Sequence, residues 1–393
     1  MTTKRRLFIG IAGAIAISLG LWGYVSYSHN RQIAVFHDQC PSAAAANDWR
    51  RLKKLSSAWL ELDSANPTAR FWMGEALQNL GDYPAASDFF QQIPLNEPRG
   101  VDAAIRLMHI QFFIEHKPSL AMQTADRLLE FDKALPEPIQ LRVYFFAMTF
   151  QREKLLREIQ TAIQCRADLP EHYVHLMILE DLSFRDGKDV VRKWVEHDTD
   201  PTHVLADSLF VHTILSERDA AVVSSEKSGS TDLTSIRHRC SDQLKERKTS
   251  PIVLEVAIRL ELEAGNQNRV AELLEMVPAL ALEDPVFWLH RGKYCLDANN
   301  IADARSSLDK AIQLYPLAWR ARGYLATVER LEGHLESGAA LQTLAAEGSR
   351  IAGACLQLKT SREIRRPLLR EIYNFASSCQ ANDVARAILR RIP

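Results

Sequence analysis

The sequence lacks the short motifs that usually mark a catalytic site. Its 393 residues contain no glycine-rich phosphate loop, no Gly-x-Ser-x-Gly and no His-Glu-x-x-His. Cysteines are few and none forms a Cys-x-x-Cys pair, which argues against structural zinc and against a small disulfide scaffold. We therefore predict no enzyme activity, no catalytic or metal-binding residue and no cofactor. We expect the cysteines to be small buried residues on helix faces: Cys40, Cys165, Cys240, Cys295, Cys355 and Cys379.

An excess of charge of either sign is also missing. Lysine and arginine number 48 against 49 aspartates and glutamates, so the formal net charge is −1. Without a basic surface there is no electrostatic footprint for a nucleic acid, and we predict no nucleic-acid partner. The hydrophobic share of 47% is ordinary for a folded chain.

One pair of histidines needs separate consideration. His172 and His175 are three residues apart on an expected helix, next to Glu171. That spacing is typical of half a metal site, but it is equally that of two ordinary histidines on one helix face. With no further ligands at suitable spacing, we interpret them as ordinary helix residues.

The N-terminus carries the one long apolar run. Residues 7–25 hold no charged side chain, and Lys4, Arg5 and Arg6 precede them directly. A helix of about 19 residues approaches the thickness of a bilayer core, and flanking cations stay on the cytoplasmic side. This pattern predicts a short cytoplasmic segment over residues 1–6 and a transmembrane signal-anchor helix over residues 7–27.

Two consequences and one alternative follow from this segment. The rest of the chain would lie outside the cytoplasm, in the periplasm of a Gram-negative type of cell, as a single-pass membrane protein. The alternative is a cleaved signal peptide, because Ser26, Tyr27 and Ser28 offer a small-x-small cleavage site.

Self-similarity is clearest near the C-terminus. Between Pro285 and Pro316, one aromatic residue, three small residues, one bulky apolar residue and a closing proline recur at fixed offsets: Trp288, Gly292, Ala304, Leu308, Ala311 and Pro316. This segment resembles a tetratricopeptide repeat, whose period is 34 residues. A shift by 34 maps Gly292 onto Ala326. A second copy begins at Pro67 with Trp72, Gly74, Ala86, Phe90 and Ile93.

The resemblance implies an all-α fold. We expect a right-handed superhelical solenoid of about nine or ten antiparallel helix pairs, and no strand-like alternation of useful length occurs. N-terminal tetratricopeptide-like helix pairs are expected over residues 28–223. An inserted polar loop follows over residues 224–235. Repeats with an arginine-rich capping helix pair complete the chain over residues 236–393.

In tetratricopeptide proteins the first helix of each pair lines a concave groove that holds a peptide or a partner helix. Mapped onto this chain, the resemblance implies ten groove residues: Phe71, Glu75, Gln78, Asn79, Glu255, Arg259, Lys293, Arg320, Thr327 and Arg330. The C-terminal end of the groove is basic, through Lys293, Arg320 and Arg330. A protein or peptide partner with an anionic segment is therefore expected there.

We thus predict a membrane-anchored scaffold that mediates protein–protein interactions in the cell envelope through its concave groove. Two alternatives stay open. One is a self-associating structural protein that forms a homodimer through the membrane helices and the last helix pair. The other is an accessory subunit of an envelope enzyme complex.

Overall fold

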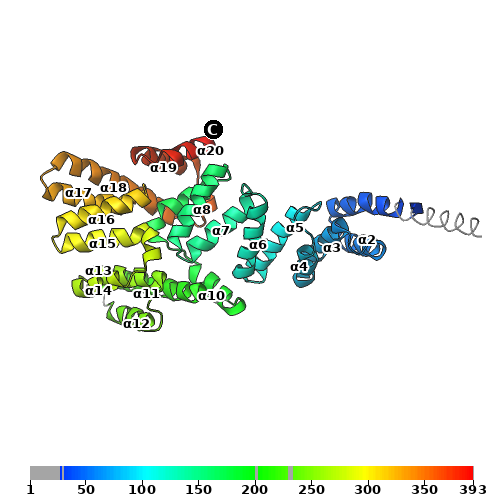
Figure 1. Ribbon diagram of the computed structural model, residues 1–393, viewed down its shortest axis with the longest axis horizontal. Helices are drawn as coiled ribbons and strands as arrows, with labels where there is room; N and C mark the ends of the chain where they lie inside the picture. Colours follow the sequence, from blue (N-terminus) through cyan, green and yellow to red (C-terminus); the bar gives the residue numbers. More distant parts are fainter. Residues whose placement is uncertain (1–26, 29–30, 200–201, 229–232, 393) are drawn as a thin grey trace, which may run out of the picture. The chain divides into compact units, whose positions relative to one another are not determined.

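The computed structural model describes residues 27–28, 31–199, 202–228 and 233–392 (Figure 1). Every regular element within these ranges is helical, so the predicted all-α class is confirmed. The chain divides after Glu115 into two compact units, which we call the N-terminal and C-terminal units.

The N-terminal unit is a run of helices in which each packs against the next. A helix over residues 31–45 comes first. It is followed by α2 (Trp49–Leu62), α3 (Pro67–Asn79), α4 (Tyr83–Gln91), α5 (Gly100–His109) and the π-helix η1 (Ile110–Ile114).

Local sequence explains where α3 begins and how it crosses α4. Asn66 accepts a hydrogen bond from the backbone N–H of Ala69 at 3.0 Å, and Pro67 occupies the first turn. At Gly74 a Cβ atom would lie 2.6 Å from the ring of Phe90 on α4. The two helices therefore approach closely only because Gly74 has no side chain.

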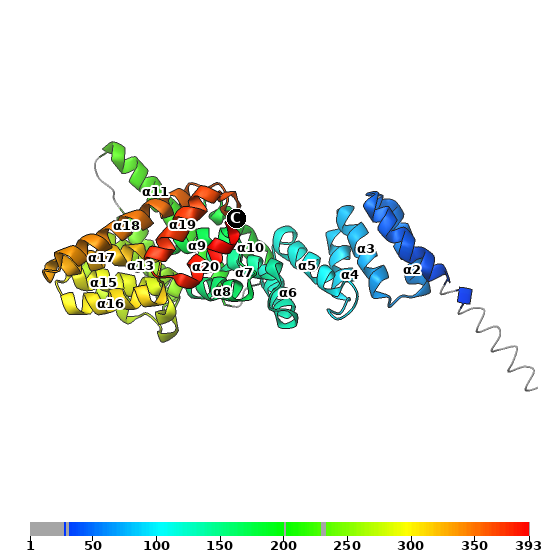
Figure 2. The ribbon, with the colours of Figure 1, turned by 90° about the horizontal axis from the view of Figure 1, so that it is seen from above.

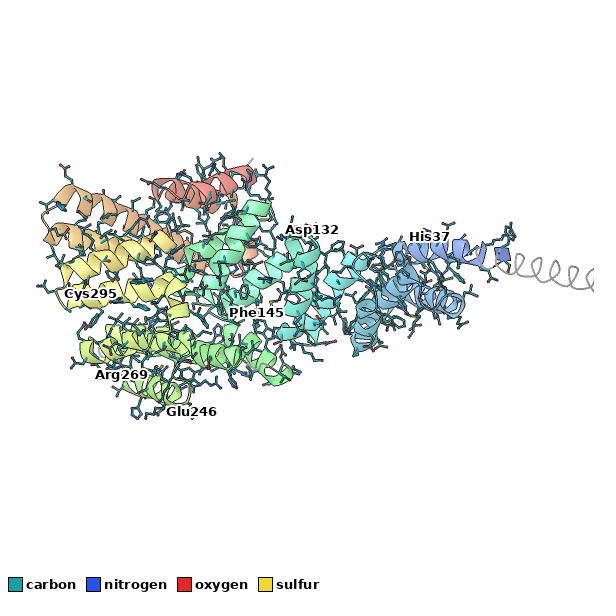
Figure 3. All side chains as sticks on the ribbon, viewed as in Figure 1. His37, Asp132, Phe145, Glu246, Arg269 and Cys295 are labelled. Carbon is teal, nitrogen blue, oxygen red and sulfur yellow. The ribbon has the colours of Figure 1, made fainter. Side chains whose placement is uncertain are left out.

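The C-terminal unit opens with less regular helices. Figure 3 labels Phe145 on α7, whose ring lies 5.8 Å from that of Trp194 on α10. The elements are α6 (Pro118–Phe131), α7 (Pro136–Met148), α8 (Arg152–Cys165), α9 (Pro170–Met177), the 3₁₀-helix η2 (Leu179–Asp181), α10 (Gly187–His197), α11 (Val204–Ser228) and α12 (Thr234–Glu246).

Regular repeats follow. Helices α13 (Pro251–Glu263), α15 (Pro285–Asp297) and α17 (Trp319–Leu331) begin at residues 251, 285 and 319, a step of 34 residues each time. Their partners begin at residues 267, 301 and 335 with the same step. These partners are α14 (Gln267–Glu275), α16 (Ile301–Leu314) and α18 (Leu335–Leu356), and the short helix η3 (Ala279–Glu283) lies between α14 and α15.

Small residues stand where these pairs cross. A Cβ atom on Gly292 of α15 would lie 2.6 Å from the side chain of Leu308 on α16, so these helices approach closely only because Gly292 has no side chain. Cys295, labelled in Figure 3 on the same helix, is buried. The other cysteines are buried too, except Cys165, which is half-buried.

The last helices return to the start of the unit. After η4 (Ser361–Glu363), α19 (Arg366–Ser378) and α20 (Asn382–Arg391) pack against α8 and α9 (Figures 1 and 2). Arg391 donates a hydrogen bond to Asp168 at 3.0 Å, and Asp168 is fully buried. The predicted capping pair is therefore also a contact surface for helices more than 200 residues earlier.

Two sequence predictions need correction. The prediction of a single-pass membrane protein is wrong: within the described ranges, no helix is both long and apolar enough to span a bilayer. The run that suggested it, residues 7–25, and the cytoplasmic segment before it lie outside the described residues. The polar loop predicted over residues 224–235 is shorter, since α11 reaches Ser228 and α12 begins at Thr234.

Candidate functional site

Two of the predicted groove residues, Glu255 and Arg259, meet in the C-terminal unit as part of a buried charge network. Glu255 on α13 is 2% exposed and accepts a hydrogen bond from Arg259, one turn later, at 2.7 Å. Arg152, at the start of α8, donates to its second oxygen at 3.1 Å. His290 on α15 lies 3.1 Å away through Nε2. We call Arg152, Glu255, Arg259 and His290 the buried network.

The charge states follow from these contacts. Burial by itself would raise the pKa of Glu255, but Arg152, Arg259 and His290 outweigh it and hold that pKa well below its usual value. Burial lowers the pKa of His290, even though Glu255 acts in the opposite direction. At neutral pH the network is therefore two guanidinium groups around one carboxylate, with a neutral imidazole donating the third bond.

The chain's own segment η2 occupies the face that these residues line. Arg320 on α17 forms an ion pair with Asp181, with one N–O distance of 2.7 Å, and its backbone N–H donates to Glu180 at 3.2 Å. Arg259 donates to the backbone oxygen of Glu180 at 3.2 Å. Arg152 donates to the backbone oxygen of Leu179 at 3.0 Å. Arg320, one of the three cations expected to receive an anionic partner, thus already binds an acidic segment of this chain.

Burial raises the pKa of Glu180 to about 7, with Arg320 acting in the opposite direction. Glu180 is fully enclosed, whereas Asp181 is partly open to solvent. The segment is therefore part of the core of the C-terminal unit and not a loosely held surface loop.

The remaining C-terminal groove residues stay outside the network. Lys293 pairs with Asp297 on its own helix. Arg330 is exposed and donates to the hydroxyl of Thr327 at 3.0 Å. The structure therefore separates Lys293, Thr327 and Arg330 from Glu255, Arg259 and Arg320.

In the N-terminal unit the predicted groove residues lie on α3 and meet a residue of α5. Arg106 donates to Glu75 at 2.8 Å and to Gln78 at 3.1 Å. Asn79 is exposed and its side chain bonds the backbone oxygen of Glu75. Phe71 is 1% exposed, so its ring supports this surface from below. We call Glu75, Gln78, Asn79 and Arg106 the α3–α5 face.

Arginines also cover the ring of Phe71. The guanidinium carbon of Arg99 lies 5.0 Å from the ring centre and that of Arg106 lies 5.6 Å from it. Both are within the range of a cation–π contact. Their side chains are 45% and 34% exposed, so both cations reach solvent while resting on a fixed aromatic ring.

Several of these residues were missed at the sequence level. Arg152, His290 and Arg106 look like ordinary helix residues in sequence, and nothing local distinguishes them. Asp284 carried a weak signal, because it precedes Pro285 and caps α15 through the N–H of Val286. Its pKa is raised to about 6 by burial, with Arg152 acting in the opposite direction.

A cavity of about 210 Å³ adjoins the buried network. Phe150, Ile252 and Phe287 form apolar walls, and the charged lining groups are Arg152, Glu153, Lys154 and Asp284. Leu280, on η3 at the rim, is 86% exposed. This arrangement is suited to holding an apolar group with one hydrogen-bonding atom.

One group of side chains in the described part of the chain has the spacing of metal ligands, namely Glu329, Glu332 and His334. Arg305 forms ion pairs with both carboxylates. The position of a cation is thus taken by a guanidinium group, and we assign no metal to it.

Comparison with known proteins gives no family. No family model matches the sequence, and no curated protein matches it. Among solved structures, the APC/C hetero-tetramer Cut9–Hcn1 has a chain with a TM-score of 0.32 at 16% identity, over 89% of this chain and 77% of that one. Yeast Tom70 has a TM-score of 0.30 at 11% identity, over 92% and 89%. Likeness at this level transfers no partner to this protein.

Proposed function

We propose that this protein is a helical-repeat scaffold that binds a protein partner through the α3–α5 face. The observation that carries the proposal is the reach of Arg106 from α5 to Glu75 and Gln78 on α3. Glu75, Gln78 and Arg106 are thereby joined on one partly exposed surface. In the regular repeats, Arg259 and Arg320 are engaged by η2, and Glu255 is held by Arg152, Arg259 and His290.

The chemistry of this face favours an extended peptide that carries a carboxylate. The amide side chains of Gln78 and Asn79 suit the backbone of such a peptide, since each amide both donates and accepts hydrogen bonds. Arg99 and Arg106 lie over the same ring and offer planar donors to a carboxylate. An incoming carboxylate would compete with Glu75 and Asp102, the acidic partners of these arginines.

Site-specific photo-crosslinking tests the proposal. The full chain would carry a benzophenone amino acid in place of Asn79 and, in a second preparation, in place of the exposed Arg330. We expect one protein to crosslink at position 79, and that crosslink to be lost with Arg106→Glu. Arg350→Glu is the matched control, because Arg350 forms an exposed ion pair with Glu371 elsewhere.

A change of fold has to be separated from a loss of binding. The double variant Glu75→Arg with Arg106→Glu restores an ion pair of opposite direction, so it should keep the helical content while still failing to bind. Equal crosslinking by wild type and Arg106→Glu would refute the proposal. So would a partner captured only from position 330, or a second copy of this chain as the captured protein.

A further inference from the structure

The C-terminal unit contains a second cavity, about 180 Å³ in volume, beside α9. A single water needs roughly 10–15 Å³ by the same kind of measure, so this space is sized for a small molecule. Helices α7 and α9 and the end of α18 form its walls, and two segments, over residues 183–186 and 358–361, form its mouth.

The walls combine aromatic and apolar surface with a few uncharged polar groups. Met148, Val174 and Ile178 are apolar, and Phe184 adds a ring whose centre lies 6.1 Å from that of His175. Burial raises the pKa of both Tyr144 and Cys355 to about 12, so the phenol and the thiol that line the cavity are uncharged.

His175 is the group that points to a ligand. Its side chain is 4% exposed and lines the cavity, and within the described residues its Nδ1 atom has no hydrogen-bond partner. A buried polar atom without a partner costs stability, so such atoms are rare and call for an explanation. Burial lowers the pKa of His175 to about 4, which leaves a neutral ring able to exchange one hydrogen bond with a ligand.

The mouth differs from the interior because it is charged. Arg185 and Asp186 stand on one loop and Lys359 on the other, all three exposed. Two cations face one carboxylate, and the hydroxyls of Ser183, Thr360 and Ser361 lie among them. A charged head group would keep its contact with water there, whereas the interior would penalise it.

We propose that this cavity binds a small aromatic carboxylic acid. The ring would pack against Phe184 and His175, a polar ring substituent would bond the imidazole, and the carboxylate would remain at the mouth near Arg185 and Lys359. Aromatic rings favour such stacked or edge-on packing. The proposal does not depend on the α3–α5 face.

Direct binding measurements with defined probes test it. The probes are 4-hydroxyphenylacetate, indole-3-acetate and 4-hydroxyphenylacetamide, titrated into the full chain by ligand-observed NMR and calorimetry. We expect at least one of the two acids to bind with a Kd below about 1 mM. The amide, which lacks the carboxylate, should bind roughly threefold to tenfold more weakly than its acid.

Two substitutions on the same helix separate binding from folding. His175→Phe keeps a ring in the wall but removes the nitrogen, so affinity should fall by roughly tenfold while the thermal midpoint rises. His172→Phe is the control. His172 is also buried on α9 but does not line the cavity, so affinity should be unchanged.

Lys359→Glu provides a test at an exposed position, where folding is not at risk, and it should weaken the acids more than the amide. The proposal is overturned if neither acid binds at 5 mM. It is also overturned if His175→Phe binds as well as wild type, or if the amide binds as tightly as the acid.

Discussion

Arg320 and Asp181 form an ion pair between elements that are 139 residues apart. Together with the bond from the backbone of Arg320 to Glu180, this pair fixes η2 against α17. Both side chains are roughly a third exposed or less, so solvent weakens the attraction only in part. The part of the regular repeats that carries Arg259 and Arg320 is thus occupied by the chain itself.

The first prediction concerns this pair. Asp181→Ala and Arg320→Ala should each lower the free energy of unfolding, and a double-mutant cycle should give a coupling of about 1 kcal/mol. Urea unfolding of the single and double variants measures it. A coupling indistinguishable from zero would mean that the contact does not hold η2 in place.

The second prediction concerns the buried network. Glu255→Gln removes the negative charge that Arg152 and Arg259 share. It leaves the two buried guanidinium groups with only their more distant carboxylates, Asp284 at 3.9 Å and Asp181 at 3.6 Å. The free energy of unfolding should fall by about 3–5 kcal/mol. Glu371→Gln, in an exposed pair with Arg350, should cost less than about 1 kcal/mol. Similar losses at the two sites would contradict the account of the network.

The third prediction concerns the close helix crossing at Gly292. Gly292→Val places carbon atoms where Leu308 already lies, so we expect a loss of about 1–3 kcal/mol. Gly353→Ala on α18 is the matched control, because a Cβ atom there meets nothing within 4 Å. Helix propensity should make that variant about 0.5–1 kcal/mol more stable. Thermal unfolding of both reads out the difference.

The fourth prediction concerns acid. Burial lowers the pKa of His212 to about 4, and its Nε2 donates to the backbone oxygen of Met148 at 2.8 Å. A histidine with a lowered folded-state pKa stabilises fully above its unfolded value of about 6.5, and this stabilisation is lost as the pH falls toward 4. At pH 5 the loss from this residue should be about 2 kcal/mol.

The variant His212→Gln isolates this contribution, because Glu180 and Asp284 have raised pKa values and gain stability over the same range. The stability difference between wild type and variant should shrink from pH 7 to pH 5. If the difference stayed constant, protonation of His212 would not be coupled to unfolding.

The local part of the fold was predictable from sequence. The repeat pattern fixes the spacing of Trp288, Gly292 and Ala304 within one helix pair. Helices α13 to α18 then follow its 34-residue step. Gly74 and Phe90 belong to the second repeat copy seen in the sequence, and the structure shows that they meet where α3 crosses α4.

The long-range part was not predictable. The return of α19 and α20 to α8, and the insertion of η2 against α17, join residues separated by 139 to 225 positions. No local pattern encodes those contacts. Arg391 illustrates the difficulty, because a terminal arginine reads as a solvated charge until the buried Asp168 is known. The candidate binding site moved from the C-terminal repeats to the α3–α5 face for the same reason. A distant segment of the chain itself, η2, engages Arg320.

Hydrogen exchange of the full chain, followed by mass spectrometry, tests the central claim most directly. If η2 permanently occupies the inner face of the C-terminal repeats, the N–H of Arg320, which donates to Glu180, should exchange as slowly as the core of α15 and α17. Asp181→Ala should accelerate that exchange. Exchange within seconds at Arg320 in the wild-type protein would contradict the account, because it would mean that η2 leaves the face readily and the C-terminal face is open to partners.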